Sequence, residues 1–287
     1  MRASAAGAPD AWSIEPARAG AVEMVRELWR YRRLLWFFAI EGIQGMYAGT
    51  SLGIFWLFAR PLFPILIGSF VFGSLLEVPS DGVPYFLFFL SGMSVWMLFD
   101  RSLLWVTRSM DQQRNLLKKL YFPRLLVPIS AVSRALVYFF IYMALIIGTA
   151  IYIFVNTGRW YLAVGPGWLV AIGASLMAIL SALAIGLYTC VLQTKYKDVR
   201  FGLRYSMGFW MYLTPVIYPI SQVPPNLRWV IYLNPMASVV ETFKWSLLGV
   251  GQLPVVPLLS AMLVVTIVGA GGVRYFLNSE AASVDDM

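Results

Sequence analysis

Six stretches of this sequence stay apolar over a membrane-crossing length, and no other feature restricts the fold as strongly. A helix needs roughly 20 mostly apolar residues to cross the hydrocarbon core of a bilayer. The stretches lie at about 51–76, 84–107, 125–155, 168–193, 205–223 and 254–277. We therefore predict an all-α polytopic membrane protein with six transmembrane helices.

The composition agrees with a membrane protein and excludes several other classes. Of the 287 residues, 60% are hydrophobic and 13% are charged, whereas about a quarter of the residues of a soluble domain are charged. The absence of histidine excludes histidine metal sites and mechanisms that use a histidine base. The single cysteine, Cys190, cannot form a disulfide within the chain. Residues 1–20 lack the apolar core of a signal peptide, so we expect a flexible cytoplasmic tail.

The positions of Lys and Arg predict the orientation of the chain, because basic loops lie on the cytoplasmic side. Basic residues gather before the first stretch, between the second and third, and between the fourth and fifth: Arg2, Arg18, Arg26, Arg30, Arg32, Arg33, Arg108, Arg114, Lys118, Lys119, Arg124, Lys195, Lys197, Arg200 and Arg204. The opposite loops contain only Arg159, Arg228 and Lys244. We therefore expect both termini in the cytoplasm. The net charge of +8 then needs no nucleic-acid partner.

The segment before the first stretch, "VEMVRELWRYRRLLW" at 22–36, is amphipathic at helical spacing. One face is apolar and the other is charged: Val25, Leu28, Trp29 and Trp36 against Glu23, Arg26, Arg30 and Arg33. This pattern predicts a helix that lies in the cytoplasmic interface of the membrane. The alternative is a generic positive anchor for the first transmembrane helix.

A polar, basic island, "DQQRNLLKKLYFPR" at 111–124, separates the second and third stretches. Its pattern predicts a short amphipathic helix over 111–121, with apolar Leu116, Leu117, Leu120 and Tyr121 opposite a polar face that contains Arg114 and Lys118. Pro123 ends this helix, because the residue before a proline prefers an extended backbone. The island is either a docking element for a partner or a surface loop that is basic only because of its side of the membrane.

Residues 225–249 are too polar to span the membrane and too apolar for a simple loop. Pro235 should interrupt any continuous helix there, and Gly249 is a typical helix end. We therefore predict two short helices that dip into the outer leaflet and return. Glu241 and Lys244 are three residues apart on the second of these, where they either pair with each other or face an outer exit.

Four segments in this order resemble one family of proteins, the permeases of type-2 ABC exporters for bacterial surface polysaccharides such as O-antigen, capsule and teichoic acid. The resemblance covers about residues 22–277. It is carried by "YAGTSLGIFWLFARPLFPILIGSFVFGSLL" at 47–76, "NLLKKLYFPR" within the island, "KYKDVRFGLRYSMGFWMYLTPVIYP" at 195–219 and "YLNPMASVVETFK" at 232–244. One departure is Arg60, where a neutral residue is expected in this family.

The resemblance implies a homodimer of permeases that forms a channel, with two copies of a separate ATPase docked beneath it. It identifies the island as the coupling helix that carries ATPase motion into the membrane, with Asp111, Arg114, Asn115, Lys118, Lys119 and Tyr121 as coupling residues. It makes the N-terminal helix a second contact with the ATPase. The sequence contains no GxxxxGK[ST] phosphate loop, so any ATP and Mg²⁺ belong to the partner chain. We divide the chain into a tail (1–21), the interfacial helix (22–47), a six-span domain (48–277) and a C-terminal cytoplasmic tail (278–287).

Aromatic side chains are candidates to line a glycan channel, because they hold the C–H faces of sugar rings weakly enough to let a polymer slide. The candidates are Tyr85, Phe88, Trp96, Phe99, Tyr138, Tyr142, Trp210 and Tyr212. The alternative is the usual role of such rings in helix packing and in membrane interfaces. Arg60 is a further lining candidate that either reaches the inner headgroups or binds a lipid diphosphate. Asp100 and Arg134 are expected to pair between neighbouring helices.

We predict a bacterial inner-membrane permease that exports a lipid-linked polysaccharide, with O-antigen first among the glycans. The alternatives are export of capsule, teichoic acid, drugs or small lipids by the same fold. A membrane-embedded glycosyl- or polyprenyl-phosphate transferase fits less well, because the 14 acidic residues are scattered and do not form a metal-binding cluster. A proton-driven carrier would need carboxylates near the midplane of the membrane, and the sequence shows no suitable cluster of them there. We therefore expect no catalytic residue, metal or cofactor in this chain. The sequence does not identify the glycan or its lipid carrier.

Overall fold

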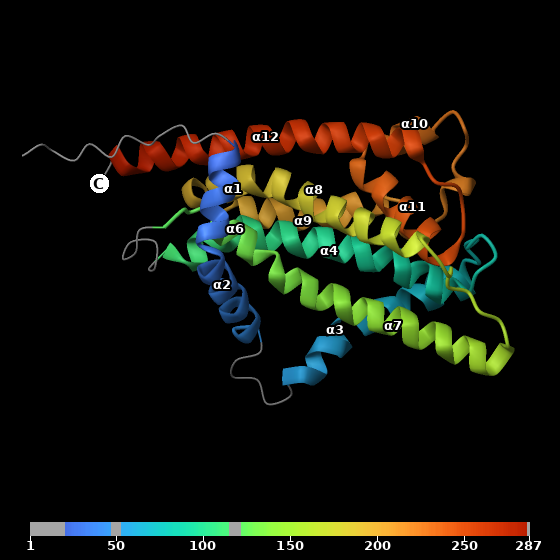
Figure 1. The fold of residues 1–287 in the computed structure, drawn as a ribbon. Helices are drawn as coiled ribbons and strands as arrows, with labels where there is room; N and C mark the ends of the chain where they lie inside the picture. The colour runs from blue at the N-terminus through green and yellow to red at the C-terminus, as the bar shows by residue number, and fades with distance from the viewer. Residues whose placement is uncertain (1–20, 47–52, 115–121, 286–287) are drawn as a thin grey trace, which may run out of the picture.

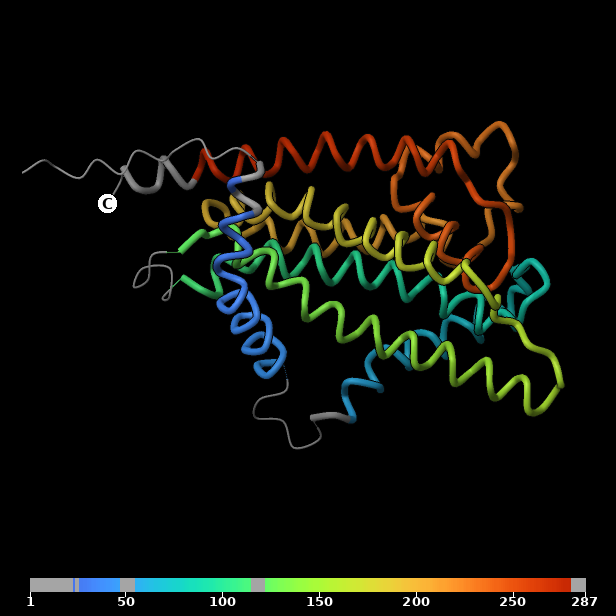
Figure 2. Tube along the Cα trace, in the orientation of Figure 1, coloured from blue at the N-terminus to red at the C-terminus, as the bar shows by residue number. Residues whose placement is uncertain are grey.

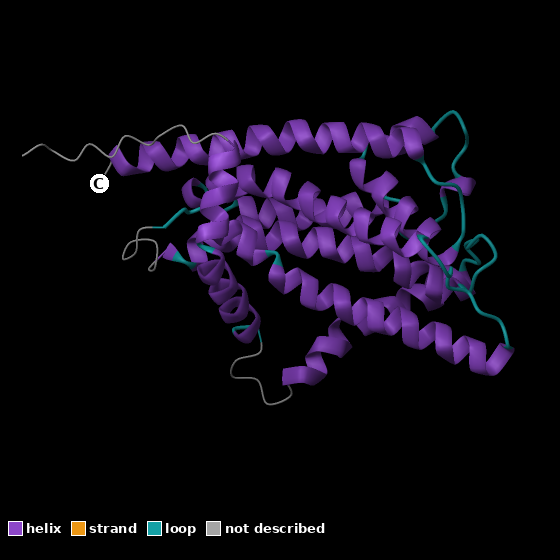
Figure 3. Cartoon of the chain, in the orientation of Figure 1, coloured by secondary structure: helices purple, strands orange, loops and turns teal. Residues whose placement is uncertain are grey.

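A computed structural model describes residues 21–46, 53–114 and 122–285, and these residues form helices and connecting loops without a strand (Figure 3). The elements, in chain order, are α1 (Ala21–Arg30), α2 (Arg32–Gln44), α3 (Gly53–Gly68), the π-helical η1 (Ser69–Leu75), α4 (Tyr85–Gln112), α6 (Leu126–Ala131), α7 (Ser133–Thr157), α8 (Gly167–Lys195), α9 (Val199–Tyr212), the 3₁₀ turn η2 (Ile220–Gln222), α10 (Arg228–Tyr232), α11 (Pro235–Leu248) and α12 (Val255–Asp285).

Five helical segments of the described residues are long and apolar enough to cross a membrane. They are Phe55–Leu75, Tyr85–Gln112, Leu126–Thr157, Gly167–Lys195 and Val255–Ser279. The all-helical class is therefore confirmed, and each of these segments coincides with one of the predicted apolar stretches.

The fifth predicted stretch, 205–223, is not a continuous helix. Helix α9 has 14 residues, which at 1.5 Å per residue makes it about 21 Å long, short of the roughly 30 Å of a bilayer core. It ends at Tyr212, three residues before Pro215. Proline lacks an amide proton and clashes with the preceding turn of a helix, so the chain leaves the helical path here.

The long helices lie side by side, with α4 and α8 at the centre and α12 and α7 on either side (Figure 1). Helices α1 and α2 do not run along the bundle as α4 does; they run across one end of it (Figure 1). The last part of α12 lies at that same end (Figure 2). We call it the basic end, because it carries the basic residues of α1 and α2 and those around the α8–α9 connection: Arg26, Arg30, Arg32, Arg33, Lys195, Lys197 and Arg200.

The predicted N-terminal amphipathic helix is two helices, α1 and α2, separated at Tyr31. Trp29 and Trp36 are exposed, whereas Leu28 packs on apolar residues of the bundle. Phe38 of α2 is buried, and its ring centroid lies 5.4 Å from that of Phe122. These contacts fix the pair against the bundle, while its position in a membrane interface stays a prediction.

Gly186 on α8 lies in close contact with Val106 of α4, and it gives a direct test of this packing. A Cβ at this position would lie 3.0 Å from the Cβ of Val106, a rigid branched side chain. Small residues at such contacts allow membrane helices to pack closely. We expect Gly186→Ala to lower the free energy of unfolding by about 1–3 kcal/mol, measured by denaturant unfolding in detergent. Gly173→Ala on the same helix, where nothing lies within 4 Å, should be neutral or stabilising; equal losses would contradict the close contact.

Candidate functional site

Hydrogen bonds between side chains tie three helices together at the basic end. Gln193, near the end of α8, is buried. Its amide nitrogen donates to Asp111 of α4 at 3.2 Å, and its amide oxygen accepts from the backbone amide of Arg200 at 2.9 Å. A single buried amide therefore connects the last turn of α4, the end of α8 and the first turn of α9.

A second set of contacts joins α4 to α2 and α7. Gln113 donates to Glu41 at 2.9 Å. Arg134 of α7 donates to Gln112 at 2.6 Å and lies 4.6 Å over the ring of Trp105. The predicted Asp100–Arg134 pair is wrong, because Asp100 is three turns away from Gln112 along α4 and its charge acts on Arg101 and Arg204 instead.

These contacts surround the start of the predicted coupling helix. Asp111 is held by Gln193, and Arg114 is exposed. The other coupling residues, Asn115, Lys118, Lys119 and Tyr121, lie outside the described residues. Their role stays a prediction.

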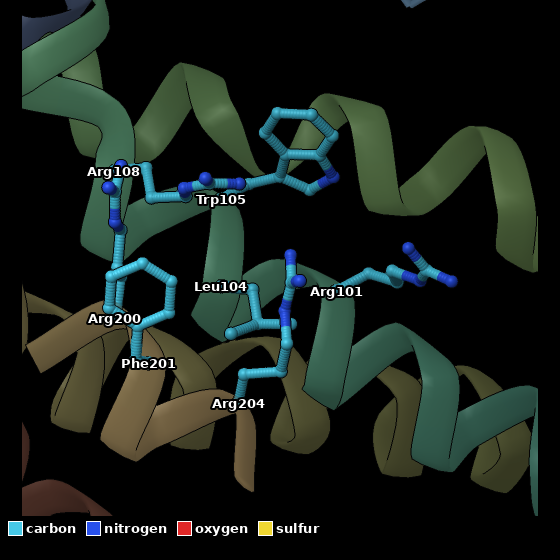
Figure 4. Close-up of a pocket in the computed structure, with 7 residues that line it drawn as sticks. All are labelled: Arg101, Leu104, Trp105, Arg108, Arg200, Phe201 and Arg204. Carbon is cyan, nitrogen blue, oxygen red and sulfur yellow. The ribbon is translucent and has the colours of Figure 1, made fainter. Parts of the chain in front are cut away.

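A cavity of about 240 Å³ opens between α4 and α9 near the basic end (Figure 4). We call it the arginine pocket, after four of the seven residues that line it: Arg101, Leu104, Trp105, Arg108, Arg200, Phe201 and Arg204. Figure 4 shows Arg200 and Arg204 projecting from α9 toward α4. Leu104, Trp105 and Phe201 form its apolar walls.

The sequence analysis treated Arg108, Arg200 and Arg204 only as markers of the inner side and missed the pocket. A signal was present, however, because Arg101, Trp105 and Arg108 are spaced four and three residues apart, as Arg200 and Arg204 are four apart. Such spacing places each set on one face of its helix. Only the packing of α9 on α4 in the structure shows that the two faces meet.

Most of the aromatic rings predicted to line a channel are buried within the chain: Phe88, Trp96, Phe99, Tyr138 and Tyr142. Trp210 is half-buried against two of them, 5.3 Å from Phe99 and 6.5 Å from Trp96. In this structure these rings pack in the interior of the bundle and do not face an open path. Tyr85 is half-buried and its hydroxyl donates to Ile217 at 2.7 Å. Of the predicted set, only Tyr212 is exposed, with an exposed fraction of 58%.

Helix α9 carries a row of exposed aromatic rings, of which the sequence analysis singled out only Tyr212. We call Phe201, Tyr205, Phe209 and Tyr212 the aromatic stripe; their exposed fractions are 50%, 72%, 73% and 58%. The spacings of four, four and three residues place these rings on one face of the helix. The stripe begins at Phe201, which also lines the arginine pocket. Gly202 and Gly208 lie in open space on the same helix.

The chain beyond α9 is non-helical and buried, and side chains satisfy its backbone. Thr214 through Ile217 are buried, so their carbonyl oxygens need partners. Lys244 of α11 donates to Pro215 at 2.6 Å and to Val216 at 3.2 Å. Tyr85 donates to Ile217, and Asn234 donates to the Thr214 hydroxyl at 2.7 Å. The break in the fifth stretch is therefore held by α4 and α11.

The predicted pair of short helices after this break is confirmed as α10 and α11. Asn234 accepts from the amide of Met236 at 3.0 Å and caps α11, with Pro235 in its first turn. Gly249 follows α11 with φ of 67°, a left-handed conformation that glycine adopts without strain. That these helices dip into the outer leaflet stays a prediction.

Glu241 and Lys244 are both buried in α11, so neither is exposed at an outer exit. The Lys244 ammonium lies 3.6 Å over the ring of Phe88. Burial lowers the pKa of Lys244 to about 8, and the charge of Glu241 opposes that shift. Burial raises the pKa of the Glu241 carboxyl, and the charge of Lys244 opposes that shift. The two groups therefore stabilise each other's charged form within the protein.

Arg60 is exposed on α3, next to Pro61. Both of its predicted roles, contact with headgroups and binding of a lipid diphosphate, stay predictions. Among the described residues, no group of three or more His, Cys, Asp or Glu side chains is placed to hold a metal ion.

Comparison with known proteins identifies the class of this chain. The profile of the ABC-2 type transporter family matches residues 33–248, a region that includes the arginine pocket, α9 and α11. The chain belongs to the ABC-2 type transporter family. An ABC-2 permease is a multi-pass membrane protein and the transport subunit of its complex. It carries no catalytic residue or cofactor of its own, and it works with an ABC ATPase.

The similar proteins are all named as O-antigen export permeases. This ABC-2 permease is 26% identical over 229 residues to the O-antigen export system permease protein RfbA of Myxococcus xanthus, covering 78% of this chain and 83% of that protein. It is 25% and 24% identical over 209 residues to two proteins of the same name from Klebsiella pneumoniae, covering 71% of this chain and 76% of each.

Proposed function

We propose that this chain is the membrane subunit of an ATP-driven exporter that moves a lipid-linked polysaccharide, with O-antigen first among the candidate glycans. The names of the similar permeases support this order of candidates. Export of capsule, teichoic acid, drugs or small lipids is the alternative within the same family.

The aromatic stripe on α9 is the observation that carries the proposal. A polymer that slides through a channel needs a row of weak contacts, and exposed rings on one helix face supply them. Tyr205 and Tyr212 add hydroxyl groups, which need a polar partner when they are removed from water. Facing a wet, sugar-filled path satisfies these hydroxyls, whereas facing lipid chains does not. The stripe therefore fits a glycan channel better than a lipid-facing surface.

The stripe lies on the surface of a single chain, so one copy cannot enclose a channel. We propose that two copies face each other and close the path between them. We also propose that α9 and the non-helical 213–219 together make a sixth, broken crossing. The two ends of the described chain then lie on one side of the membrane, in agreement with their position at the same end of the bundle (Figure 1).

We propose that the basic end faces the cytoplasm of a bacterium, since basic residues mark the inner side of a membrane. The ABC ATPase then docks at this end, on the island at 111–121 and on the helices α1 and α2, whose Arg26, Arg30 and Arg33 are candidates for that contact.

Removing two rings of the stripe tests the proposed channel. We expect Tyr205→Ala with Phe209→Ala to lower export of surface glycan about tenfold, because each ring contact is worth about 0.5–1.5 kcal/mol. Export is measured as surface polysaccharide in cells that depend on this permease and its ATPase. The matched control is Phe140→Ala with Tyr152→Ala on α7, whose rings are 65% and 69% exposed outside the stripe. Normal export in the stripe variant, or an equal loss in the control, would contradict a channel along α9.

A further inference from the structure

We propose that the arginine pocket binds the phosphate groups of an anionic lipid headgroup, with a diphosphate as the best match. This inference rests on the proposed function, because the lipid would be the carrier of the exported glycan. It goes beyond that function by naming the residues that would hold the headgroup.

The charges in the pocket favour an anion. Four arginines, Arg101, Arg108, Arg200 and Arg204, line one cavity. The guanidinium of Arg101 is directed away from Arg204 and lies 5.3 Å over the ring of Tyr138 (Figure 4). Within the described residues, no hydrogen bond or ion pair to a carboxylate joins any of these arginines. The Nε atom of Arg200 is buried without a hydrogen-bond partner. Asp100 is the acidic residue whose charge acts on Arg101 and Arg204, so the pocket keeps an excess of positive charge.

The chemistry of the cations favours phosphate in particular. Arginine presents a planar set of N–H donors that matches two oxygens of a phosphate group at once. Two arginines come from α4 and two from α9, and Figure 4 shows those of α9 reaching toward α4. Several arginines spread along one cavity suit two linked phosphates better than one.

The depth of the pocket favours a lipid over a soluble anion. Arg108 is four residues from the end of α4 and Arg101 is eleven, which places them about 6 Å and 16 Å from that end at 1.5 Å per residue. With the basic end at the cytoplasmic face, as proposed above, the pocket would lie where a headgroup meets the hydrocarbon core. Its apolar walls, Leu104, Trp105 and Phe201, provide surface for the part of the lipid next to the phosphates.

The position of the pocket also connects it to the aromatic stripe. Phe201 lines the pocket and is the first ring of the stripe. A headgroup held by the arginines would place the first sugar at the start of the row of rings. The pocket would thus align a lipid-linked glycan with the path along α9 before export.

The test is a binding measurement on the full-length permease with its ATPase, in nanodiscs of neutral phosphatidylcholine. The probes are a polyprenyl diphosphate, the polyprenol of the same chain length, and inorganic diphosphate. We expect the polyprenyl diphosphate to bind at least tenfold more tightly than either other probe. We expect Arg101→Gln with Arg204→Gln to weaken its binding at least tenfold, while Arg101→Lys with Arg204→Lys retains part of it.

The matched control is Lys195→Gln with Lys197→Gln, which removes the same charge from exposed residues at the same end outside the pocket. This control should bind as the wild type does, and thermal unfolding should show that all variants are folded. Equal binding by the pocket variant and the wild type would overturn the proposal. Binding of inorganic diphosphate as tight as that of the lipid would overturn it in favour of a free-anion site.

A third outcome would also overturn the proposal. If lipid binding is unchanged and the pocket variant no longer binds its ATPase, the pocket is a contact with that protein.

Failure of the proposed function looks different. A wild-type complex that binds the polyprenyl diphosphate but moves no glycan in cells would contradict polysaccharide export and leave the headgroup site standing. Normal glycan export without any lipid binding to the pocket would contradict the headgroup site and leave polysaccharide export standing.

Discussion

Replacing Lys244 with methionine is expected to lower the free energy of unfolding by about 3–5 kcal/mol. The ammonium group is buried and donates to the carbonyl oxygens of Pro215 and Val216. Without it, two buried carbonyl groups lose their partner, and each orphaned group costs about 1–3 kcal/mol. The carboxylate of Glu241 also loses the positive charge that opposes the effect of its burial. Denaturant unfolding of the purified permease in detergent measures the loss.

Two further variants separate this explanation from a general effect of removing a cation. Arg228, at the same end of the bundle, also donates to two backbone carbonyls, Val223 at 2.9 Å and Ser221 at 3.3 Å, but it is only half-buried. Arg228→Met should therefore cost less than about 1 kcal/mol. Adding Glu241→Gln to Lys244→Met should recover part of the stability, because it removes the unpaired charge. If Lys244→Met and Arg228→Met are equally mild, Lys244 does not hold the break after α9.

Reversing two charges in the basic island is expected to uncouple ATP hydrolysis from export. Arg114→Glu with Lys118→Glu should lower glycan export at least tenfold, while the permease still folds and ATP hydrolysis by the complex continues. The reason is that an ATPase surface matched to basic residues would meet like charges, which costs several kcal/mol at an interface. Surface polysaccharide in cells and ATP hydrolysis by the purified complex are the two measurements.

The structure indicates how a force on the island could reach the channel. Asp111 and Arg114 lie in and just after the last turn of α4, and Gln193 connects Asp111 to the backbone of Arg200 in α9. A displacement of the island would thus act on the helix that carries the aromatic stripe. Lys195→Glu with Lys197→Glu makes the same charge change on exposed residues of the α8–α9 connection and should leave export within about twofold. Normal surface polysaccharide in the island variant would count against the docking role.

The candidate site divides into parts that a sequence reveals and parts that it hides. Pro215 and Pro219 were visible inside the fifth apolar stretch, and greater weight on these helix breakers would have replaced the continuous helix with the observed break. Pro235 and Gly249 correctly marked the limits of α11. Burial was harder to predict, because Phe88 and Tyr212 are both aromatic residues of apolar stretches, yet one is 1% exposed and the other is 58% exposed.

The sequence by itself determined the class of the protein, five of its membrane-crossing segments, the basic end and the limits of α11. These features depend on apolar length, on the placement of Lys and Arg and on local backbone preferences, all of which act within one segment. Only the tertiary structure decided that four arginines of α4 and α9 share a pocket, that the exposed rings lie along α9, and that Lys244 holds the non-helical chain after α9. Each of these depends on which faces of distant helices meet, and an apolar helix in a membrane can present almost any face to a neighbour without a change in its own hydropathy.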